Sequence, residues 1–255
     1  MTALAQTTMA LPTRPLLTFT FVTAFALAGC GPGIDEATRS SGGGSSDAMV
    51  RLVNVADDRP SLDLYAGNTV VQSGVALNAT GAYGSVAAGS VSLNVRAPGN
   101  QTPLGASTTT LAKGDHLAVV ASTTGSTFSS TLLGEDESNP SRGTAKLRVL
   151  NLAATEAGPL DLFIAASCSN LPSTATPTVA SGASGYVQVT SPSTATHLCV
   201  TKGGDRTDLR LDVASVTLSD QRIVTLILVR TSAIVKLVKG LTLDQQGALV
   251  ALAAP

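Results

Sequence analysis

Arg51-Leu-Val-Asn-Val-Ala56, followed after a polar loop by Leu62-Asp-Leu-Tyr65, decides the fold because the chain contains this pattern twice. The second copy is Arg148-Val-Leu-Asn-Leu-Ala153, followed after another loop by Leu160-Asp-Leu-Phe163. Each copy is typical of two short strands joined by a turn. A chain of 255 residues has room for one or two ordinary domains, and the repeat predicts two similar ones.

Short apolar runs alternate with Gly, Asn, Asp, Ser and Pro along the rest of the chain, as in a series of strands and turns. No stretch there has convincing helical periodicity. So many short strands favour an all-β fold of two tandem, predominantly antiparallel β-sandwiches. In the first unit we predict strands near 49–56, 61–66, 69–72, 82–87, 90–97, 107–112, 116–122 and 127–133.

The domain boundaries follow from composition. The segment 134–144 is charged and broken by a proline, which is typical of a linker. We place the linker at 139–144, between sandwiches at 48–138 and 145–255. The stretch 247–253 resembles the opening of a repeat. We therefore expect the strand that opens each repeat to border the preceding sheet, and a terminal strand to do the same for the second unit.

The N-terminus has the pattern of a secretion signal. A basic residue precedes the apolar run 16–28, which is too short for a bilayer span of about 20 residues. The run ends in Leu27-Ala-Gly-Cys30, which resembles the lipobox of bacterial lipoproteins. We predict a signal peptide over 1–29 and lipidation of Cys30, which would hold the protein at a membrane. The alternative is an ordinary secretory signal with a chance cysteine.

The residues after the lipobox predict how the protein is attached. Gly31 stands where lipoproteins retained in the inner membrane typically carry Asp. We therefore expect the protein to be anchored in the outer membrane and to contact the membrane only through its lipid. Residues 30–47 comprise the lipidated cysteine and a Gly- and Ser-rich tether, which cannot bury enough apolar area to fold.

Three stretches resemble the bacterial envelope family called domain of unknown function 4397: residues 51–65, residues 86–96, and Glu135-Asp-Glu-Ser-Asn-Pro140 leading into Lys146-Leu-Arg-Val-Leu-Asn151. The resemblance covers nearly all of 48–255 as two tandem copies. It implies a secreted or lipid-anchored protein with immunoglobulin-like or transthyretin-like sandwiches, and it brings no established activity. The second copy departs from the pattern, because it has a different first loop and an insert after Ala166.

Two cysteines remain once Cys30 carries lipid, and pairing is the expected fate of Cys168 and Cys199 in an oxidising compartment. By strand alternation Cys199 is predicted to face outward from its sheet together with His197. A disulfide would then hold the Pro- and Ser-containing segment 167–184, which we call the excursion, across that outer face. The alternative is two free thiols too far apart to bond.

The two histidines, His116 and His197, lie one in each unit at positions that are not equivalent, so a histidine-based metal site or relay lacks members. We expect both to be ordinary strand residues. The sequence also contains no Gly-x-Ser-x-Gly elbow, no Ser-x-x-Lys pair and no phosphate-binding Gly loop. We therefore predict no catalytic residues, no metal and no cofactor.

Several polar residues recur at matched positions of the two copies. They could form a small polar site at one end of each sandwich, or they could satisfy turn backbone groups and form partly exposed ion pairs, which is the interpretation we favour. Asp57-Asp58 and Glu135-Asp136-Glu137 lack a regular calcium-ligand spacing, so we expect solvated loop charge there. The recurring residues are Arg51 with Arg148, Asn54 with Asn151, and Asp63 with Asp161.

Three classes of function are compatible with these patterns. The leading hypothesis is a non-enzymatic lipid-anchored envelope protein with a structural, adhesive or protein-binding role. A glycan-binding module is the alternative, although aromatic residues make up only 3% of the chain. An enzyme would need a pocket that gathers Asp63 or Asp161 with other perturbed groups. The sixteen Lys and Arg are scattered and the net charge is -1, which argues against nucleic acid as a partner.

Overall fold

The computed structural model describes residues 47–191, 196–231, 238–244 and 249–252. All of them lie in one compact unit, Gly43–Pro255. The predicted signal peptide, the cysteine predicted to carry lipid and the predicted tether up to residue 46 lie outside the described residues. Within the described residues, no helix is long and apolar enough to cross a membrane.

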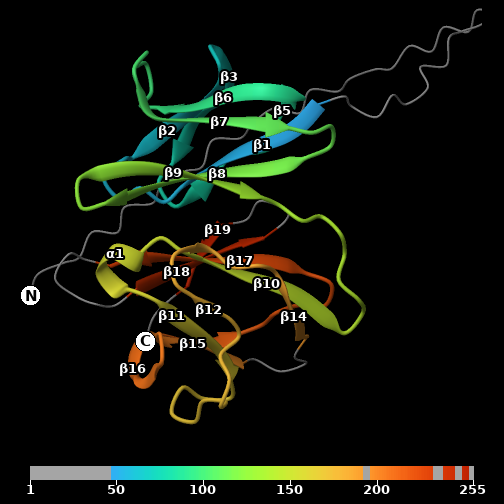
Figure 1. Cartoon of the computed structure of the whole chain (residues 1–255), viewed down its shortest axis with the longest axis vertical. Helices are drawn as coiled ribbons and strands as arrows, with labels where there is room; N and C mark the ends of the chain where they lie inside the picture. The colour runs from blue at the N-terminus through green and yellow to red at the C-terminus, as the bar shows by residue number, and fades with distance from the viewer. Residues whose placement is uncertain (1–46, 192–195, 232–237, 245–248, 253–255) are drawn as a thin grey trace, which may run out of the picture. The chain divides into compact units, whose positions relative to one another are not determined.

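Two sheets form the first half (Figure 1). In sheet A, β1 pairs with β8 on one side and with the short strands β4 and β5 on the other, and β9 pairs with β8. Sheet B has the order β3-β2-β6-β7. The strands are β1 (Asp47–Asn54), β2 (Ser61–Ala66), β3 (Thr69–Ala76), β4 (Ala79–Thr80), β5 (Gly84–Ala87), β6 (Gly89–Arg96), β7 (Pro103–Leu111), β8 (His116–Thr124) and β9 (Thr127–Gly134).

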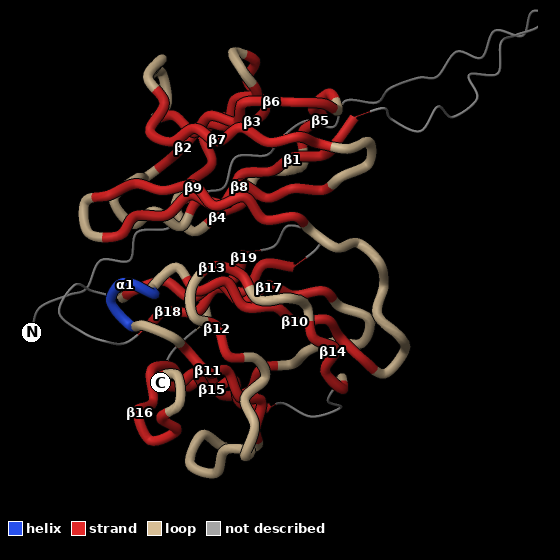
Figure 2. Tube along the Cα trace, viewed as in Figure 1, coloured by secondary structure: helices blue, strands red, loops and turns tan. Residues whose placement is uncertain are grey.

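The second half repeats this order, as the tube in Figure 2 shows. Sheet C has β13 and β14 beside β10, then β17 and β18, with β19 added at the end; sheet D has the order β12-β11-β15-β16. The elements are β10 (Thr144–Asn151), α1 (Ala154–Ala157), β11 (Leu160–Ala165), β12 (Thr178–Val179), β13 (Gly182–Ala183), β14 (Val187–Thr190), β15 (Thr196–Lys202), β16 (Asp205–Val216), β17 (Ile223–Arg230), β18 (Val238–Asp244) and β19 (Leu249–Ala251).

The predicted all-β sandwich fold is confirmed, and most strand pairs are antiparallel. Each sandwich also contains one parallel pair. β1 runs parallel to β8, with Leu52 opposite Val119, and β10 runs parallel to β17, with Val149 opposite Leu226. The sequence could not predict this pair, because a period of two assigns side chains to faces but says nothing about the direction of the neighbouring strand.

Three apolar layers hold the four sheets together. One fills the space between sheets A and B, and another the space between sheets C and D. The third joins the outer faces of sheets A and C, so the sheets stack in the order B, A, C, D (Figure 1). Its buried members are Val53, Val55, Ala118, Val120 and Leu133 from the first half, and Leu150, Ile227, Leu241 and Leu243 from the second.

Two expectations about the second unit have different outcomes. The terminal strand is present as β19, which pairs antiparallel with β18 and places Leu249 opposite Leu243. The expectation that the opening strand of a repeat borders the preceding sheet is wrong for β10. That strand pairs with β13, β14 and β17 and stacks on sheet A through side chains, because its outer face is apolar enough to be buried there.

Candidate functional site

The recurring asparagines hold the loop that follows the opening strand of each copy. Asn54 donates from Nδ2 to the carbonyl oxygens of Arg59 and Val75, each at 3.1 Å, and its Oδ1 accepts from the Ala56 amide. Asn151 is buried in the same way, and its Oδ1 accepts from the Ala153 amide at 3.0 Å. A buried amide that satisfies backbone groups on three sides fixes a loop geometry.

The recurring aspartates also bind backbone and hydroxyl groups close to their own strands. Asp63 accepts from the Gly74 amide at 2.7 Å. Asp161 accepts from the Thr178 hydroxyl at 2.5 Å and from the Gly204 amide at 2.9 Å. Both carboxylates are therefore occupied by turns at the edges of sheets B and D.

The recurring arginines lie on the opposite face of the opening strand, toward the junction between the sandwiches. Arg51 is 1% exposed and forms a two-pronged ion pair with Glu135, in which Nε lies 2.9 Å from Oε2. Tyr83 donates to the same carboxylate at 2.6 Å, and the guanidinium lies over the Tyr83 ring, 4.7 Å from its centre. Arg51 also donates to the Asp244 carbonyl in sheet C. This clamp connects sheet A to sheet C.

The second arginine completes the junction from the other side. Arg148 is buried, donates to the Thr225 hydroxyl at 2.8 Å and reaches the Gly134 carbonyl of the first sandwich at 2.6 Å. Its guanidinium lies over the Tyr186 ring, 4.4 Å from the centre. Tyr186 precedes β14 as Tyr83 precedes β5, so an Arg-Tyr pair recurs at corresponding places. The sequence signal for this pair is a tyrosine next to a glycine at the start of the short strand, and it occurs in both copies.

Burial and charge act in opposite directions at this junction. Burial alone would lower the pKa of the Arg51 guanidinium, but the hydrogen bonds and charge of Glu135 more than offset this, and its pKa is raised. The pKa of Arg148 is lowered, mainly by burial, because its partners are neutral groups and Arg51 repels it. Burial, and then the hydrogen bond to Glu135, raises the pKa of the Tyr83 hydroxyl. Glu135 is thus the carboxylate on which the junction depends.

The expectation of solvated loop charge at 135–137 is wrong for Glu135, whereas Asp136 and Glu137 keep 34% and 38% of their side chains exposed while pairing with basic residues. Glu135 is 8% exposed and holds Arg51. Asp136 binds Lys146 at 2.5 Å, and Glu137 lies 3.2 Å from the imidazole of His116. The linker is therefore tied to both sandwiches, although its composition resembles that of a free loop.

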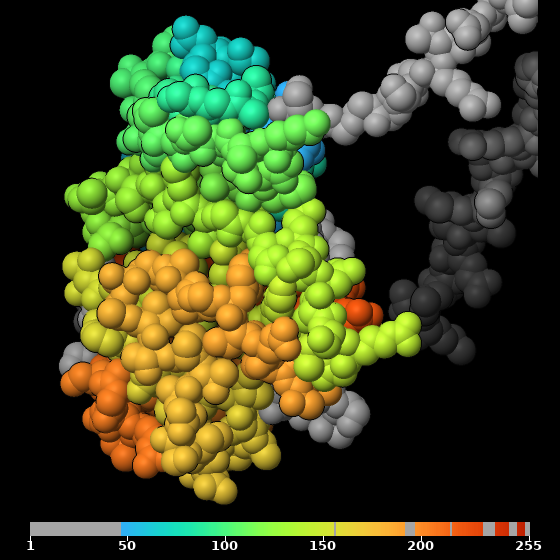
Figure 3. All heavy atoms as spheres, turned by 45° about the vertical axis from the view of Figure 1, so that its right-hand side comes forward, coloured from blue at the N-terminus to red at the C-terminus, as the bar shows by residue number. Residues whose placement is uncertain are grey.

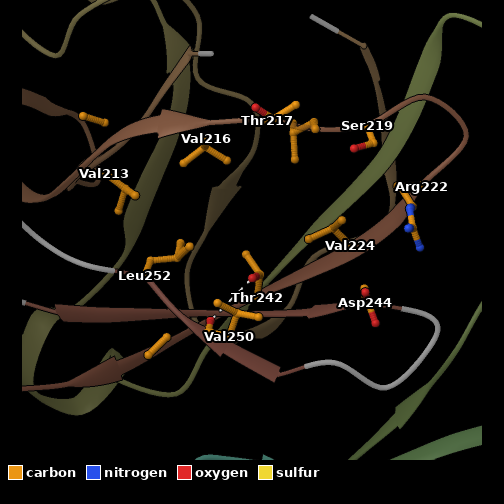
Figure 4. A pocket seen from close by; sticks show the side chains of 13 residues that line it. Val213, Val216, Thr217, Ser219, Arg222, Val224, Thr242, Asp244, Val250 and Leu252 are labelled. Atoms are coloured by element: carbon orange, nitrogen blue, oxygen red, sulfur yellow. Dashed lines mark hydrogen bonds between the residues drawn. The ribbon is translucent and has the colours of Figure 1, made fainter. Parts of the chain in front are cut away.

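A groove of about 450 Å³ opens along one edge of the second sandwich, between β16 and the β18–β19 hairpin (Figure 4). Its lining is partly apolar and partly polar, and the polar residues are Thr217, Ser219, Arg222, Thr242 and Asp244. In the first sandwich, Gly105 on β7 lies against the Phe128 ring of β9, where an added Cβ would come within 2.9 Å of the ring. The apolar lining consists of Val213, Ala214, Val216, Leu218, Val224, Val250, Ala251 and Leu252.

The structure separates the residues that could have formed a duplicated polar site. Asn54 and Asp63 serve loops around the first sandwich, while Arg51 lies at the junction; the matching residues of the second copy are divided in the same way. The predicted disulfide between Cys168 and Cys199 is present, with the two Cα atoms 5.5 Å apart. The groove could not be predicted, because its walls come from β16 to β19, and local sequence patterns do not say which of these strands lie side by side.

We expect Arg51→Met and Glu135→Leu each to lower the free energy of unfolding by about 3–5 kcal/mol, because either change leaves one buried charge without its partner. The double variant, which replaces both charges by apolar groups, should lose much less than the sum. Urea denaturation of the three variants measures this coupling. Arg59→Met is the control, since its ion pair with Asp58 is exposed and should contribute less than about 1 kcal/mol. Additive losses would contradict the clamp.

The Asp136 carboxyl should titrate near pH 2, because the hydrogen bond from Lys146, followed by those from Ser138, lowers its pKa to about 2. The ionised Asp136 carboxylate then stabilises the folded state at pH values above the ordinary pKa of an aspartate, and this stabilisation is lost as the pH falls through about 2. Lys146→Met should raise the midpoint, as followed by NMR of the carboxyl carbon. Lys113→Met, at an exposed turn, should leave it unchanged. An unshifted midpoint in Lys146→Met would contradict the assignment.

Comparison with known proteins gives one family match. Among solved structures, similar chains are described as "Alpha-glucan recognition by family 41 carbohydrate-binding modules from streptococcal virulence factors" (14% identity, 72% of this chain and 93% of that chain, TM-score 0.26) and "Alpha-glucan binding by a streptococcal virulence factor" (12%, 71%, 93% and 0.25). Likenesses this weak carry no inference about the ligand. No curated protein matches the chain. Residues 48–163 match the family described as Domain of unknown function (DUF4397), a range that covers the first sandwich and extends into β11.

Proposed function

We propose that this chain is a non-enzymatic, lipid-anchored protein of the bacterial cell envelope, and that its two DUF4397-type sandwiches act together as one protein-binding module. The attachment rests on the lipobox-like Leu27-Ala-Gly-Cys30, and the outer membrane on Gly31. The second copy of the domain is supported by the repeated strand order and by the recurring asparagines and Arg-Tyr pairs.

The observation that carries the proposal is how the buried polar groups are used. Asn54, Asp63 and their counterparts bind loops, while Arg51 and Glu135 bind one sandwich to the other. Groups held in this way stabilise a scaffold, whereas catalysis needs groups directed at a substrate. The third apolar layer adds the area that keeps the two sandwiches from moving independently.

The partner surface in this proposal is the groove and the strand beside it. β19 is the last strand of sheet C among the described residues, so its outer backbone edge can pair with an added strand. Val250 in β19 is 54% exposed and lines the groove. An extended protein segment with apolar side chains at alternate positions would pair with β19 and fill the groove.

Glycan binding remains the alternative, but the aromatic residues are used elsewhere. Sugar rings stack on free aromatic faces, and each tyrosine in the described residues has an arginine over its ring: Tyr65 under Arg96, Tyr83 under Arg51 and Tyr186 under Arg148. The described phenylalanines pack in apolar clusters.

Lipidation is tested by labelling cells with a tagged fatty acid. We expect the label on the natural chain and its loss in Cys30→Ser, together with loss of the protein from the membrane fraction. Cys168→Ser combined with Cys199→Ser is the control, since it keeps Cys30 and should stay labelled. A labelled Cys30→Ser chain would contradict the proposed anchor.

The partner surface is tested by crosslinking in cells, with Val250→Asp compared with Val70→Asp. Val70 is a matched control because it is 52% exposed on the edge strand of sheet B. We expect a protein that crosslinks to the natural chain and to Val70→Asp but not to Val250→Asp, because a charge in the groove opposes apolar binding. Equal crosslinking by both variants would contradict the groove as the site, and the absence of any protein adduct would contradict protein binding.

A further inference from the structure

The outer face of sheet D carries a cluster of metal-binding side chains beneath the excursion that follows β11. Cys199 on β15 is fully buried and lies directly opposite Phe163 on β11 and Asp212 on β16. Cys168, in the excursion, is bonded to it. The excursion forms part of the molecular surface (gold in Figure 3), and its later part returns into sheet D as β12.

The donor atoms of this cluster are close together. The Sγ atoms of Cys168 and Cys199 and a carboxylate oxygen of Asp212 lie within 4.8 Å of one another. The Nδ1 atom of His197 lies 2.8 Å from Oδ1 of Asp212 and 3.9 Å from Sγ of Cys168. Two sulfurs, an imidazole nitrogen and a carboxylate oxygen make up a donor set that zinc takes in proteins.

We propose that reduction of the disulfide by a dithiol converts this cluster into a zinc site. In the exchange, the two thiols of the reductant become its own disulfide, the Cys168–Cys199 bond breaks, and the two hydrogens pass to the cysteine sulfurs. One Zn²⁺ then displaces both thiol protons into solvent. It is held by the two thiolates, by Asp212 and by Nδ1 of His197.

Tetrahedral coordination requires the two sulfurs to move apart and one further contact to lengthen. With Zn–S near 2.3 Å and Zn–N or Zn–O near 2.0–2.1 Å, neighbouring ligand atoms lie about 3.3–3.8 Å apart. The contact between His197 and Cys168 is already close to this spacing, while the broken S–S bond must widen and the contact between His197 and Asp212 must lengthen by roughly 0.5–1 Å. Strands β15 and β16 position three of the ligands, and the excursion supplies the fourth.

The surroundings of these four side chains favour the binding of an ion. Phe163 packs around Cys199 with Leu171 and Ala175 of the excursion, so the sulfur side of the site is apolar. His197 and Asp212 keep 28% and 25% of their side chains exposed, which leaves an entry path for the ion. Two thiolates and a carboxylate in such a place repel one another, and a divalent cation relieves that repulsion.

The first sandwich lacks this donor set. The strand registers place Ser92, Asn94 and Ala106 where the second sandwich has His197, Cys199 and Asp212. The donor set therefore belongs to the copy that carries the excursion, and none of its four residues lines the groove.

The test uses the full chain carrying Cys30→Ser, so that Cys168 and Cys199 are its only cysteines. The protein is reduced with dithiothreitol, freed of it by anaerobic gel filtration and titrated with Co²⁺, a spectroscopic probe for zinc sites. We expect one equivalent to bind with the absorption bands of tetrahedral, thiolate-ligated cobalt, and one equivalent of Zn²⁺ to displace it. The unreduced protein should show no such bands.

Variants at the non-sulfur ligands separate this site from a simple pair of thiols. His197→Ala and Asp212→Asn should each weaken zinc binding at least tenfold, while His116→Ala and Asp205→Asn, at sites away from the cluster, should bind like the parent. Circular dichroism follows folding after reduction. The proposal is overturned by reduced protein that binds Co²⁺ no better than oxidised protein, by His197→Ala and Asp212→Asn variants that bind normally, or by a chain that unfolds on reduction and does not refold with zinc.

Discussion

The buried ion pair between Arg51 and Glu135 is the constraint on which the arrangement of the two sandwiches depends. A guanidinium that is 1% exposed needs a carboxylate beside it, because burying a charge without a partner costs much more free energy than burying it as an ion pair. Glu135 follows directly after β9 and can reach Arg51 only where the chain leaves sheet A. The pair thereby holds the start of the linker beside sheet A. The strand that follows the linker, β10, packs on the outer face of that sheet.

The apolar layer between sheets A and C gives this pair its surroundings. Val53 and Val120 of sheet A point away from their own core and are covered by Leu150 and Ile227 of sheet C. Each sheet of a sandwich commonly has one solvated face, and here the outer faces of sheets A and C are buried against each other. Each sandwich therefore covers an apolar face of the other.

The two copies share several local side-chain interactions and differ where the residues around them differ. The asparagine at the end of the opening strand binds backbone groups of the following loop in both copies, and the Arg-Tyr pair also recurs. Glu135 pairs with Arg51, while Arg148 binds the neutral Thr225 hydroxyl and the Gly134 carbonyl. Among the described residues, the groove, β19 and the disulfide-bonded excursion are features of the second copy.

The sequence by itself determined the strands, their two faces and the repeat. Alternation at Leu52 and Val53 follows from the geometry of an extended chain, and the outward direction of Cys199 follows from the same rule. Only the tertiary structure decided that β1 and β8 run parallel, that Arg51 meets Glu135, and that Cys199 is buried by the excursion it binds. These contacts join residues far apart in the chain, and their partners depend on how the sheets stack, which no local pattern of apolar and polar residues records.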